Sequence, residues 1–195
     1  MGKIFCLMGK SASGKDTIYS RLLKKEDLSL KRVVPYTTRP VRSGETDGET
    51  YYFCTNQKAD ELERAGKIIE LRAYDTVHGI WKYFTADDGQ ICLEQDNYLM
   101  IGTLEAYEKI RDYFGAEYVC PVYVWVDDGI RLERALARER SQENPKYAEM
   151  CRRFLADEKD FSEENLKRDE IEIRFENSDM ETVLDRITDY IRQNI

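Results

Sequence analysis

A glycine-rich segment near the amino terminus has the composition of a loop that binds phosphate groups. Gly9, Gly14 and Lys15 fit the pattern G-x-x-x-x-G-K, between a short apolar run and a segment with helical spacing. Glycines let backbone N–H groups turn toward phosphate oxygens, the helix adds the positive end of its dipole, and the lysine adds a mobile charge. The alternative is an ordinary glycine-rich turn. The expected contacts to ATP are Gly9, Ser11, Ala12, Ser13, Gly14, Lys15, Asp16 and Thr17.

The residue after the loop lysine departs from the usual pattern. A Ser or Thr hydroxyl normally binds Mg²⁺ at this position, but here Asp16 follows Lys15, and Thr17 comes next. A carboxylate is a stronger Mg²⁺ ligand, although it also places negative charge beside a triphosphate. Asp16 is therefore our candidate metal ligand.

A second segment, residues 36–53, contains residues suited to a phosphate monoester. Arg39 and Arg42 lie three positions apart and are flanked by hydroxyl groups and by Tyr51. Guanidinium groups bind phosphate oxygens through paired hydrogen bonds. Taken alone, such a segment is more often a solvated charged loop. In a chain that also has a phosphate loop, it indicates a second phosphate site.

Together the two segments resemble the guanylate kinase family, in which T-T-R-x-x-R-x-G-E-x-x-G-x-x-Y binds the phosphate of GMP. The resemblance is strong over residues 1–53 and weaker over the rest of the chain. It implies a P-loop nucleoside monophosphate kinase that phosphorylates GMP to GDP with ATP and Mg²⁺. It assigns the GMP phosphate site to Thr38, Arg39, Arg42, Glu45 and Tyr51.

The same resemblance implies a base-reading residue. Residues 66–70 are similar to the family segment that ends in a glutamate, here Glu70, which recognises guanine. A carboxylate can accept from the adjacent N1–H and N2–H₂ donors of guanine, and adenine lacks that pair. Thr85 is expected to supply a hydroxyl for guanine O6, and Trp81 or Tyr83 to pack either on the ligand or in the core.

Two family features are missing. Pro35 replaces a serine, which removes one hydroxyl contact. Residues 98–105 match the strand that ends in Asp-x-Asp in the family, but they contain no aspartate. Because Asp16 appears where a hydroxyl is expected, our hypothesis is that the magnesium-binding carboxylate has moved to Asp16.

Arginines crowd the region of residues 131–153. Most are expected to form ion pairs on a solvated helical face, but phosphoryl transfer needs cations that follow the moving negative charge. The family supplies them from a helical lid, and Arg140 with Arg152 or Arg153 matches its spacing best. Asn177 resembles the family asparagine near the adenine of ATP, and residues 178–179 could instead merely cap the last helix.

Strand-like and helix-like segments alternate along the chain, which predicts an α/β fold with a mostly parallel central sheet. The predicted segments include a strand at 32–36, helices at 104–114, 130–142 and 146–166, a helix cap at Asp127 or Asp128, and a loop that contains His78. By resemblance the fold is the three-layer P-loop NTPase fold. At 195 residues we expect a single domain. We expect its core to comprise residues 1–32, 91–130 and 167–195, with a strand-rich GMP-binding insert at 33–90 and a helical lid at 131–166.

Composition restricts the partners. Thirty Lys and Arg against 38 Asp and Glu give a net charge of −8, which argues against a general nucleic-acid or anionic-membrane binder. A single histidine excludes a multi-histidine metal site. Five scattered cysteines and the lack of an apolar run of about 20 residues predict a cytoplasmic protein. The expected partners are ATP and GMP, and the oligomeric state stays open.

Two alternatives remain. Ribose 1,5-bisphosphate phosphokinases also resemble guanylate kinases and carry Gly-Lys-Asp and Thr-Arg-Pro, as residues 14–16 and 38–40 do here. The retained Arg42, Glu45, Tyr51 and Glu70 argue against that reading. A non-catalytic binding module would explain the missing Asp-x-Asp, but it has no use for the intact phosphate loop.

Overall fold

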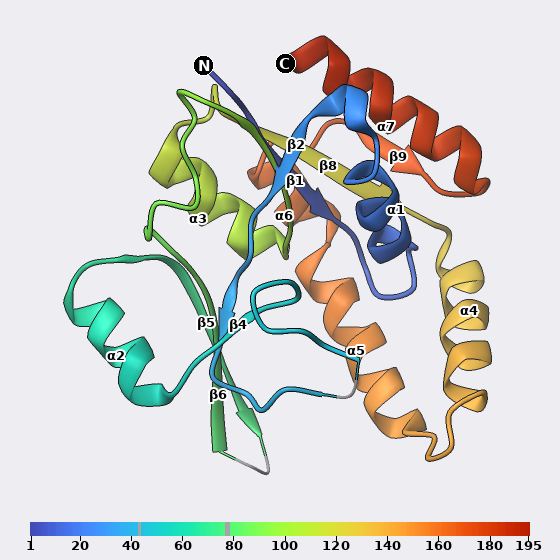
Figure 1. Ribbon diagram of the computed structural model, residues 1–195. Coiled ribbons are helices and arrows are strands. Elements are labelled where there is room, and N and C mark those ends of the chain that lie inside the picture. The colour runs from blue at the N-terminus through green and yellow to red at the C-terminus, as the bar shows by residue number, and fades with distance from the viewer. Residues whose placement is uncertain (43, 77–78) are drawn as a thin grey trace.

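The computed structural model describes residues 1–42, 44–76 and 79–195, in which strands and helices alternate (Figure 1). The strands are β1 (Ile4–Met8), β2 (Leu30–Arg32), β3 (Tyr36–Thr37), β4 (Tyr52–Phe53), β5 (Ile68–Thr76), β6 (Gly79–Ala86), β7 (Asn97–Ile101), β8 (Val119–Trp125) and β9 (Arg174–Glu176). The helices are α1 (Lys15–Leu22), α2 (Asn56–Arg64), α3 (Leu104–Phe114), α4 (Asp128–Arg140), α5 (Tyr147–Asp160), α6 (Glu163–Arg168) and α7 (Met180–Asn194), with a short 3₁₀ turn at Glu26–Leu28.

The central sheet has five strands in the order β2-β7-β1-β8-β9, and every pair is parallel. Its middle strand, β1, is fully buried, as expected for a parallel strand covered on both faces. The α/β fold with a mostly parallel central sheet is therefore confirmed.

Alternate residues of β1 face two separate cores. Phe5 and Leu7 lie in the core beneath α1 and α7, whereas Ile4, Cys6 and Met8 lie in the core beneath α3 and α6. The two helical layers thus bury opposite faces of one sheet, which makes the three-layer arrangement of the fold. This arrangement places the carboxyl end of β1 and the loop after it at the edge where a ligand can bind.

A second sheet, in the order β4-β3-β6-β5, lies within the segment 33–90. The single strand predicted at residues 32–36 is wrong: β2 ends at Arg32 in the central sheet, and β3 begins at Tyr36 in the second sheet. Pro35 lacks an N–H group and cannot continue a ladder of hydrogen bonds. The short crossing at 33–35 therefore links the two sheets.

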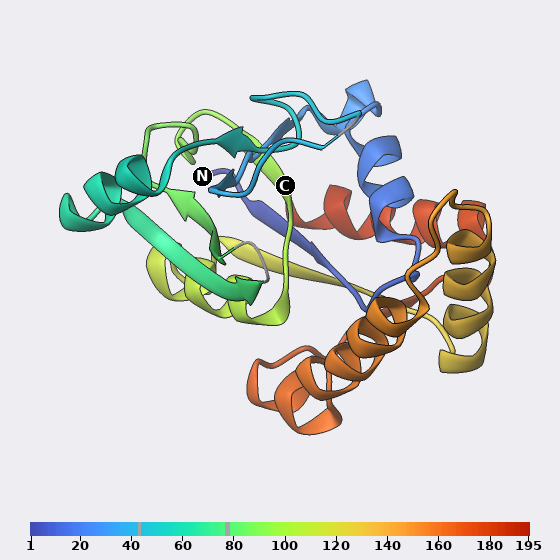
Figure 2. The same ribbon diagram turned by 90° about the horizontal axis from the view of Figure 1, so that it is seen from below.

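Helices α4 and α5 lie at the loop end of the central sheet (Figure 2), and α6 follows α5 and packs on the sheet. The helix predicted for residues 146–166 is interrupted, because Ser162 caps α6 by accepting from the backbone N–H of Asn165. Phe161 anchors this corner by stacking on Tyr123 of β8 at 5.4 Å between ring centroids. Among the described helices, none has the length and apolar character needed to cross a membrane.

Candidate nucleotide-binding site

The loop from Gly9 to Thr17 joins β1 to α1 and needs glycine at two positions. A Cβ on Gly9 would lie 2.6 Å from the carbonyl oxygen of Val124, and one on Gly14 would lie 2.5 Å from Nδ2 of Asn177. Gly14 also has a φ of +85°, which side chains disfavour. The amino-terminal turn of α1 follows directly, so backbone N–H groups and a helix dipole converge there.

The side chain of Asn177 is hydrogen-bonded to the backbone of this loop. Its buried side chain donates from Nδ2 to the carbonyl oxygen of Ser13 at 2.7 Å, and its backbone N–H donates to Trp125. The residue expected beside the adenine of ATP therefore holds the backbone of the phosphate loop. The Ser13 hydroxyl is a buried polar group with no hydrogen-bond partner among the described atoms.

Lys15 and Asp16 lie at the start of α1, with differing exposure. The Lys15 side chain is 20% exposed, the Asp16 side chain is 81% exposed, and their charged groups are 3.8 Å apart. An exposed carboxylate oxygen beside the phosphate loop is the kind of hard ligand that Mg²⁺ prefers. Among the described residues no cluster of three metal-ligating side chains forms, so Asp16 would contribute one ligand.

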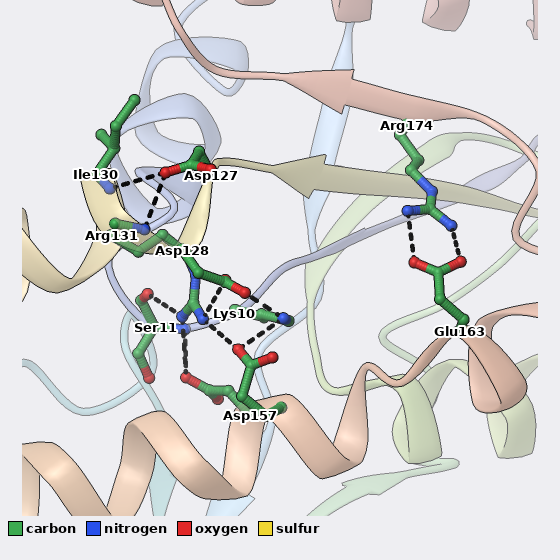
Figure 3. Close-up of polar contacts among 11 residues, drawn as sticks. Lys10, Ser11, Asp127, Asp128, Ile130, Arg131, Asp157, Glu163 and Arg174 are labelled. Atoms are coloured by element: carbon green, nitrogen blue, oxygen red, sulfur yellow. Dashed lines mark hydrogen bonds and ion pairs between the residues drawn. The ribbon is translucent and has the colours of Figure 1, made fainter.

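The glycine-rich loop also contacts α5, which belongs to the segment predicted as a lid (Figure 3). The backbone N–H of Ser11 donates to Oδ2 of Asp157 at 2.7 Å. Beside it, the ammonium group of Lys10 donates to Glu158 at 2.7 Å and to Asp128 at 3.4 Å. A carboxylate from the lid thus occupies an N–H donor of the loop.

Arg131 ties these groups together. Its side chain is fully buried, and it donates to the carbonyl oxygen of Ser11 at 3.0 Å, to Asp128 and to Glu158. Its guanidinium also lies 4.4 Å from the ring centroid of Phe154. Burial alone would raise the pKa of Asp128, but the charges and hydrogen bonds of Arg131 and Lys10 together outweigh it and hold that pKa below its ordinary value.

The predicted lid arginines differ in their surroundings. Arg140 and Arg153 are exposed, and neither forms an ion pair within the described part of the chain. Arg152 pairs with Glu149 through two hydrogen bonds of 2.7 Å, which is the solvated helical pair that we expected of most of these arginines. Arg134 lies closer to the phosphate loop, where it donates to the carbonyl oxygen of Asn177 at 3.2 Å.

Arg39 forms the centre of the predicted acceptor site. Its nearly buried guanidinium makes two hydrogen bonds with Glu45, at 2.7 and 2.5 Å. It also lies 5.0 Å from the ring centroid of Tyr51 and 5.4 Å from that of Phe53. The hydrogen bonds from Arg39 hold the pKa of Glu45 below its ordinary value. The guanidinium is therefore fixed in place before any ligand binds.

Other predicted acceptor residues surround it. The backbone N–H of Arg42 donates to Glu45, while its side chain is exposed and forms no ion pair with another described residue. Burial raises the pKa of Tyr51, so its phenol stays protonated as a donor at neutral pH. The hydroxyl of Thr38 accepts from the backbone N–H of Lys82 and locks the loop onto β6.

Glu70 lies on β5 in a buried pair that we did not predict. Arg72 donates to both of its carboxylate oxygens, at 3.0 and 3.2 Å. The fully buried Thr85 donates its hydroxyl hydrogen to Glu70 at 2.9 Å. That hydrogen is therefore not available for guanine O6, and Thr85 acts on the carboxylate instead.

Residues 102 and 103, directly after β7, lie near the place where the resemblance predicts the Asp-x-Asp of the family. Thr103 caps α3 by accepting from the backbone N–H of Ala106 at 3.2 Å. Gly102 packs closely, since a Cβ there would lie 3.5 Å from the Cys6 sulfur. This edge provides a helix start rather than carboxylate ligands.

Several residues in the site were not predicted. Lys10 carries a signal that was available, because it is a cation inside the phosphate loop. Arg72 also carries a signal, because it lies two residues from Glu70 and a strand places both side chains on one face. The roles of Arg131 and Asp157 depend on contacts with Ser11, which lies more than 100 residues away from each. Residue spacing could not indicate those contacts. His78, expected in a loop, lies outside the described residues.

Comparison with known proteins agrees with this arrangement. Residues 1–80 match the guanylate kinase family model. A guanylate kinase of Clostridioides difficile is 31% identical over 127 residues, which cover 64% of this chain and 57% of that protein. One from Rhodopseudomonas palustris is 40% identical over 79 residues, which cover 40% of this chain and 36% of that protein. The matched segments thus span less than two thirds of these relatives.

The fold likeness extends further than the sequence match. The crystal structure of guanylate kinase from Anaplasma phagocytophilum superposes with a TM-score of 0.65 at 22% identity, covering 98% of this chain and 85% of that one. Residues 1–80 are thus similar in sequence to the guanylate kinase family, and the chain as a whole is similar in fold to a guanylate kinase.

Proposed function

We propose that the protein transfers a phosphoryl group from ATP to GMP and forms GDP. The observation that carries this proposal is the combination of the glycine-rich loop around Lys15 with an arginine, Arg39, held ready by Glu45 and two aromatic rings. The first suits a triphosphate and the second a phosphate monoester. The family match over residues 1–80 includes both segments.

On this proposal, ATP binds along the loop from Gly9 to Thr17. Lys15 stabilises negative charge on the transferred group, and Asn177 keeps the loop in shape. Arg140 and Arg153, which are exposed, supply lid cations once the lid has closed. Catalysis then consists of positioning and charge stabilisation, with no covalent enzyme intermediate.

The acceptor binds on the second sheet. Arg39, Arg42 and Tyr51 contact the phosphate of GMP, Glu45 orients Arg39, and Glu70 meets the base. The division into a core, an acceptor insert at 33–90 and a lid at 131–166 follows the same proposal. The five free cysteines suit a reducing compartment, and we place the protein in the cytoplasm.

Mg²⁺ accompanies ATP in this proposal. The Asp16 carboxylate fits the requirement for one hard oxygen ligand, and phosphate oxygens and water complete the shell of Mg²⁺ at sites of this kind. When bound, the ion neutralises charge on the β- and γ-phosphates. The protein residues hold the two nucleotides in line and exclude water.

A coupled assay of ADP formation tests the proposal. Wild-type protein should form ADP only when ATP, Mg²⁺ and GMP are all present. Lys15→Met should lower kcat by about 10²–10³-fold, the effect of removing one donor that stabilises the transition state. Arg42→Met should mainly raise the KM for GMP.

Arg64→Met is the matched control, because Arg64 is an exposed arginine on α2 that donates to the backbone of its own helix. It should leave both constants unchanged. ADP formation that does not depend on GMP, or that survives Lys15→Met, would refute the proposal.

A further inference from the structure

Arg72 is hydrogen-bonded to the carboxylate of Glu70, the residue that we expect to recognise the base of the acceptor. Its Nε donates to Oε2 of Glu70 at 3.0 Å, and its Nη2 donates to Oε1 at 3.2 Å. The two residues are two apart on β5, so their side chains lie on one face of the sheet. The Glu70 side chain is 1% exposed and that of Arg72 is 15% exposed. The pair is therefore shielded from water and resists displacement.

The lone pairs of Glu70 are largely used. An ionised carboxylate offers about four acceptor sites, two on each oxygen. Oε1 accepts from Arg72 and from the hydroxyl of Thr85, which fills both of its sites. Oε2 accepts from Arg72 alone among the described residues, which leaves one site. Glu70 thus has room for one further N–H donor, not for two side by side.

Arg72 adds hydrogen-bond donors to the same place. Burial would lower the pKa of Arg72, but the charge of Glu70 and the hydrogen bonds to it together outweigh burial and raise that pKa, so the guanidinium stays charged. Two of its five N–H groups donate to Glu70, and the other three donate to no residue that the structure describes. The pair therefore presents one acceptor together with several donors.

That pattern fits one edge of a purine. A 6-oxopurine presents the N1–H donor beside the O6 acceptor, and these match the remaining site on Glu70 and the donors of Arg72. Guanine and hypoxanthine share this edge. The 2-amino group, which guanine alone carries, would need a second acceptor site on Glu70 next to the first, and the hydrogen bonds of Arg72 and Thr85 fill that site.

We propose that Arg72 is a specificity-determining residue that restricts Glu70 to a single base contact, so that the acceptor site recognises N1–H and O6 without the 2-amino group. This inference rests on the proposed function. GMP and inosine monophosphate are then phosphorylated with similar efficiency. AMP, which has neither N1–H nor O6, is rejected.

The test compares kcat/KM for GMP, inosine monophosphate and AMP at saturating ATP and Mg²⁺. Wild-type protein should show a ratio of GMP to inosine monophosphate below about tenfold. Arg72→Met should raise that ratio by about ten- to a hundredfold, the effect of one added hydrogen bond to a charged group. The control, Arg64→Met, should leave it unchanged.

Two further measurements separate base recognition from a folding defect and from a change in the rate of phosphoryl transfer. Arg72→Lys retains the charge but not the two-pronged contact, and it should give an intermediate ratio. Calorimetric binding of GMP and inosine monophosphate should reproduce the kinetic ratio. A change in stability alone would alter both acceptors equally and would leave the ratio fixed.

The outcomes separate this inference from the proposed function. A wild-type preference for GMP over inosine monophosphate of a hundredfold or more overturns the role of Arg72 and leaves the proposed function standing. If neither purine nucleotide binds or is phosphorylated while ribose 1,5-bisphosphate is, the proposed function fails, and the inference fails with it.

Discussion

The carboxylate of Asp157 accepts a hydrogen bond of 2.7 Å from the backbone N–H of Ser11, so the lid helix α5 supplies an anion to the phosphate loop. Arg131 and Lys10 hold this arrangement by pairing with the neighbouring Glu158. The triphosphate of ATP is also anionic and is expected at the same loop. If the proposed function holds, the Asp157 carboxylate competes with the nucleotide through both its charge and its hydrogen bond.

Replacement of Asp157 by asparagine should tighten the binding of ATP. The amide keeps the shape of the side chain but removes the negative charge and weakens the hydrogen bond to Ser11. We expect about fivefold tighter binding, because a charge-assisted hydrogen bond exceeds a neutral one by about 1 kcal/mol. Isothermal titration calorimetry with ATP measures it.

Asp160→Asn is the control for Asp157→Asn, since it removes the same charge from the same helix and Asp160 has no side-chain hydrogen bond with a described residue. The Asp160 variant should change the free energy of ATP binding by less than half as much as the Asp157 variant does. Weaker ATP binding by the Asp157 variant would mean that the carboxylate assists the nucleotide rather than competing with it.

Substitution of Gly14 should lower the free energy of unfolding by more than the cost of its left-handed backbone conformation, because the added Cβ would also clash with Asn177. Gly14→Ala introduces a Cβ at a φ of +85° and 2.5 Å from Nδ2 of Asn177. Gly66→Ala introduces one at a φ of +66° with open space around it. The second variant measures the cost of the left-handed backbone, about 1 kcal/mol.

Urea denaturation of both glycine variants measures the difference. Gly14→Ala should lose about 1–3 kcal/mol more than Gly66→Ala, because Asn177 must move and its bond to Ser13 must break or stretch. Equal losses would show that Asn177 yields without cost, and that it does not hold the loop.

The Arg39–Glu45 pair should make stability depend on pH. Glu45 has a lowered pKa in the folded protein because Arg39 donates to it, so this contribution is fully present above its unfolded value of about 4.5. It is lost as the pH falls through the lower folded value. Wild type should therefore exceed Glu45→Gln by about 1 kcal/mol at pH 7 and by progressively less below pH 4.5.

Chemical denaturation of wild type and Glu45→Gln at several pH values checks the expected convergence. Glu49→Gln is the control, since Glu49 is an exposed acid of the same loop with no side-chain hydrogen bond to a described residue. A stability gap between wild type and Glu45→Gln that stays constant from pH 7 to pH 3.5 would contradict the assignment.

Replacement of Asp16 by alanine should uncouple ATP binding from Mg²⁺ and slow turnover severely, because alanine supplies neither a carboxylate nor the hydroxyl that usually binds Mg²⁺ at this position. The carboxylate is exposed at the start of α1 and is our candidate metal ligand. Calorimetric titration of ATP with and without Mg²⁺ gives the coupling independently of turnover. We expect the Mg²⁺-dependent gain in affinity to shrink by about tenfold, the weakening typical of a disturbed metal shell.

Asp185→Ala removes a carboxylate from an exposed position on α7 and should leave the Mg²⁺ dependence intact. An Asp16→Ala variant with undiminished turnover would show that the metal-binding carboxylate has not moved to this residue.

The sequence by itself determined the elements and the chemistry that depend on local order. The phosphate loop, the helix from Leu104 to Phe114 and the helix cap at Asp127 follow from neighbouring residues, and each lies where we predicted it. Apolar runs such as Ile4–Met8 also reveal a buried parallel strand, because such a strand needs no polar face.

Only the tertiary structure decided how the charged side chains are paired. The burial of Arg131, the Ser11–Asp157 contact and the hydrogen bond from Thr85 of β6 to Glu70 of β5 depend on which elements the fold brings together and on how closely. Charged residues look alike in a sequence whether they are solvated or paired. Their state is set by burial and by the geometry of their partners, which exist only once the chain has folded.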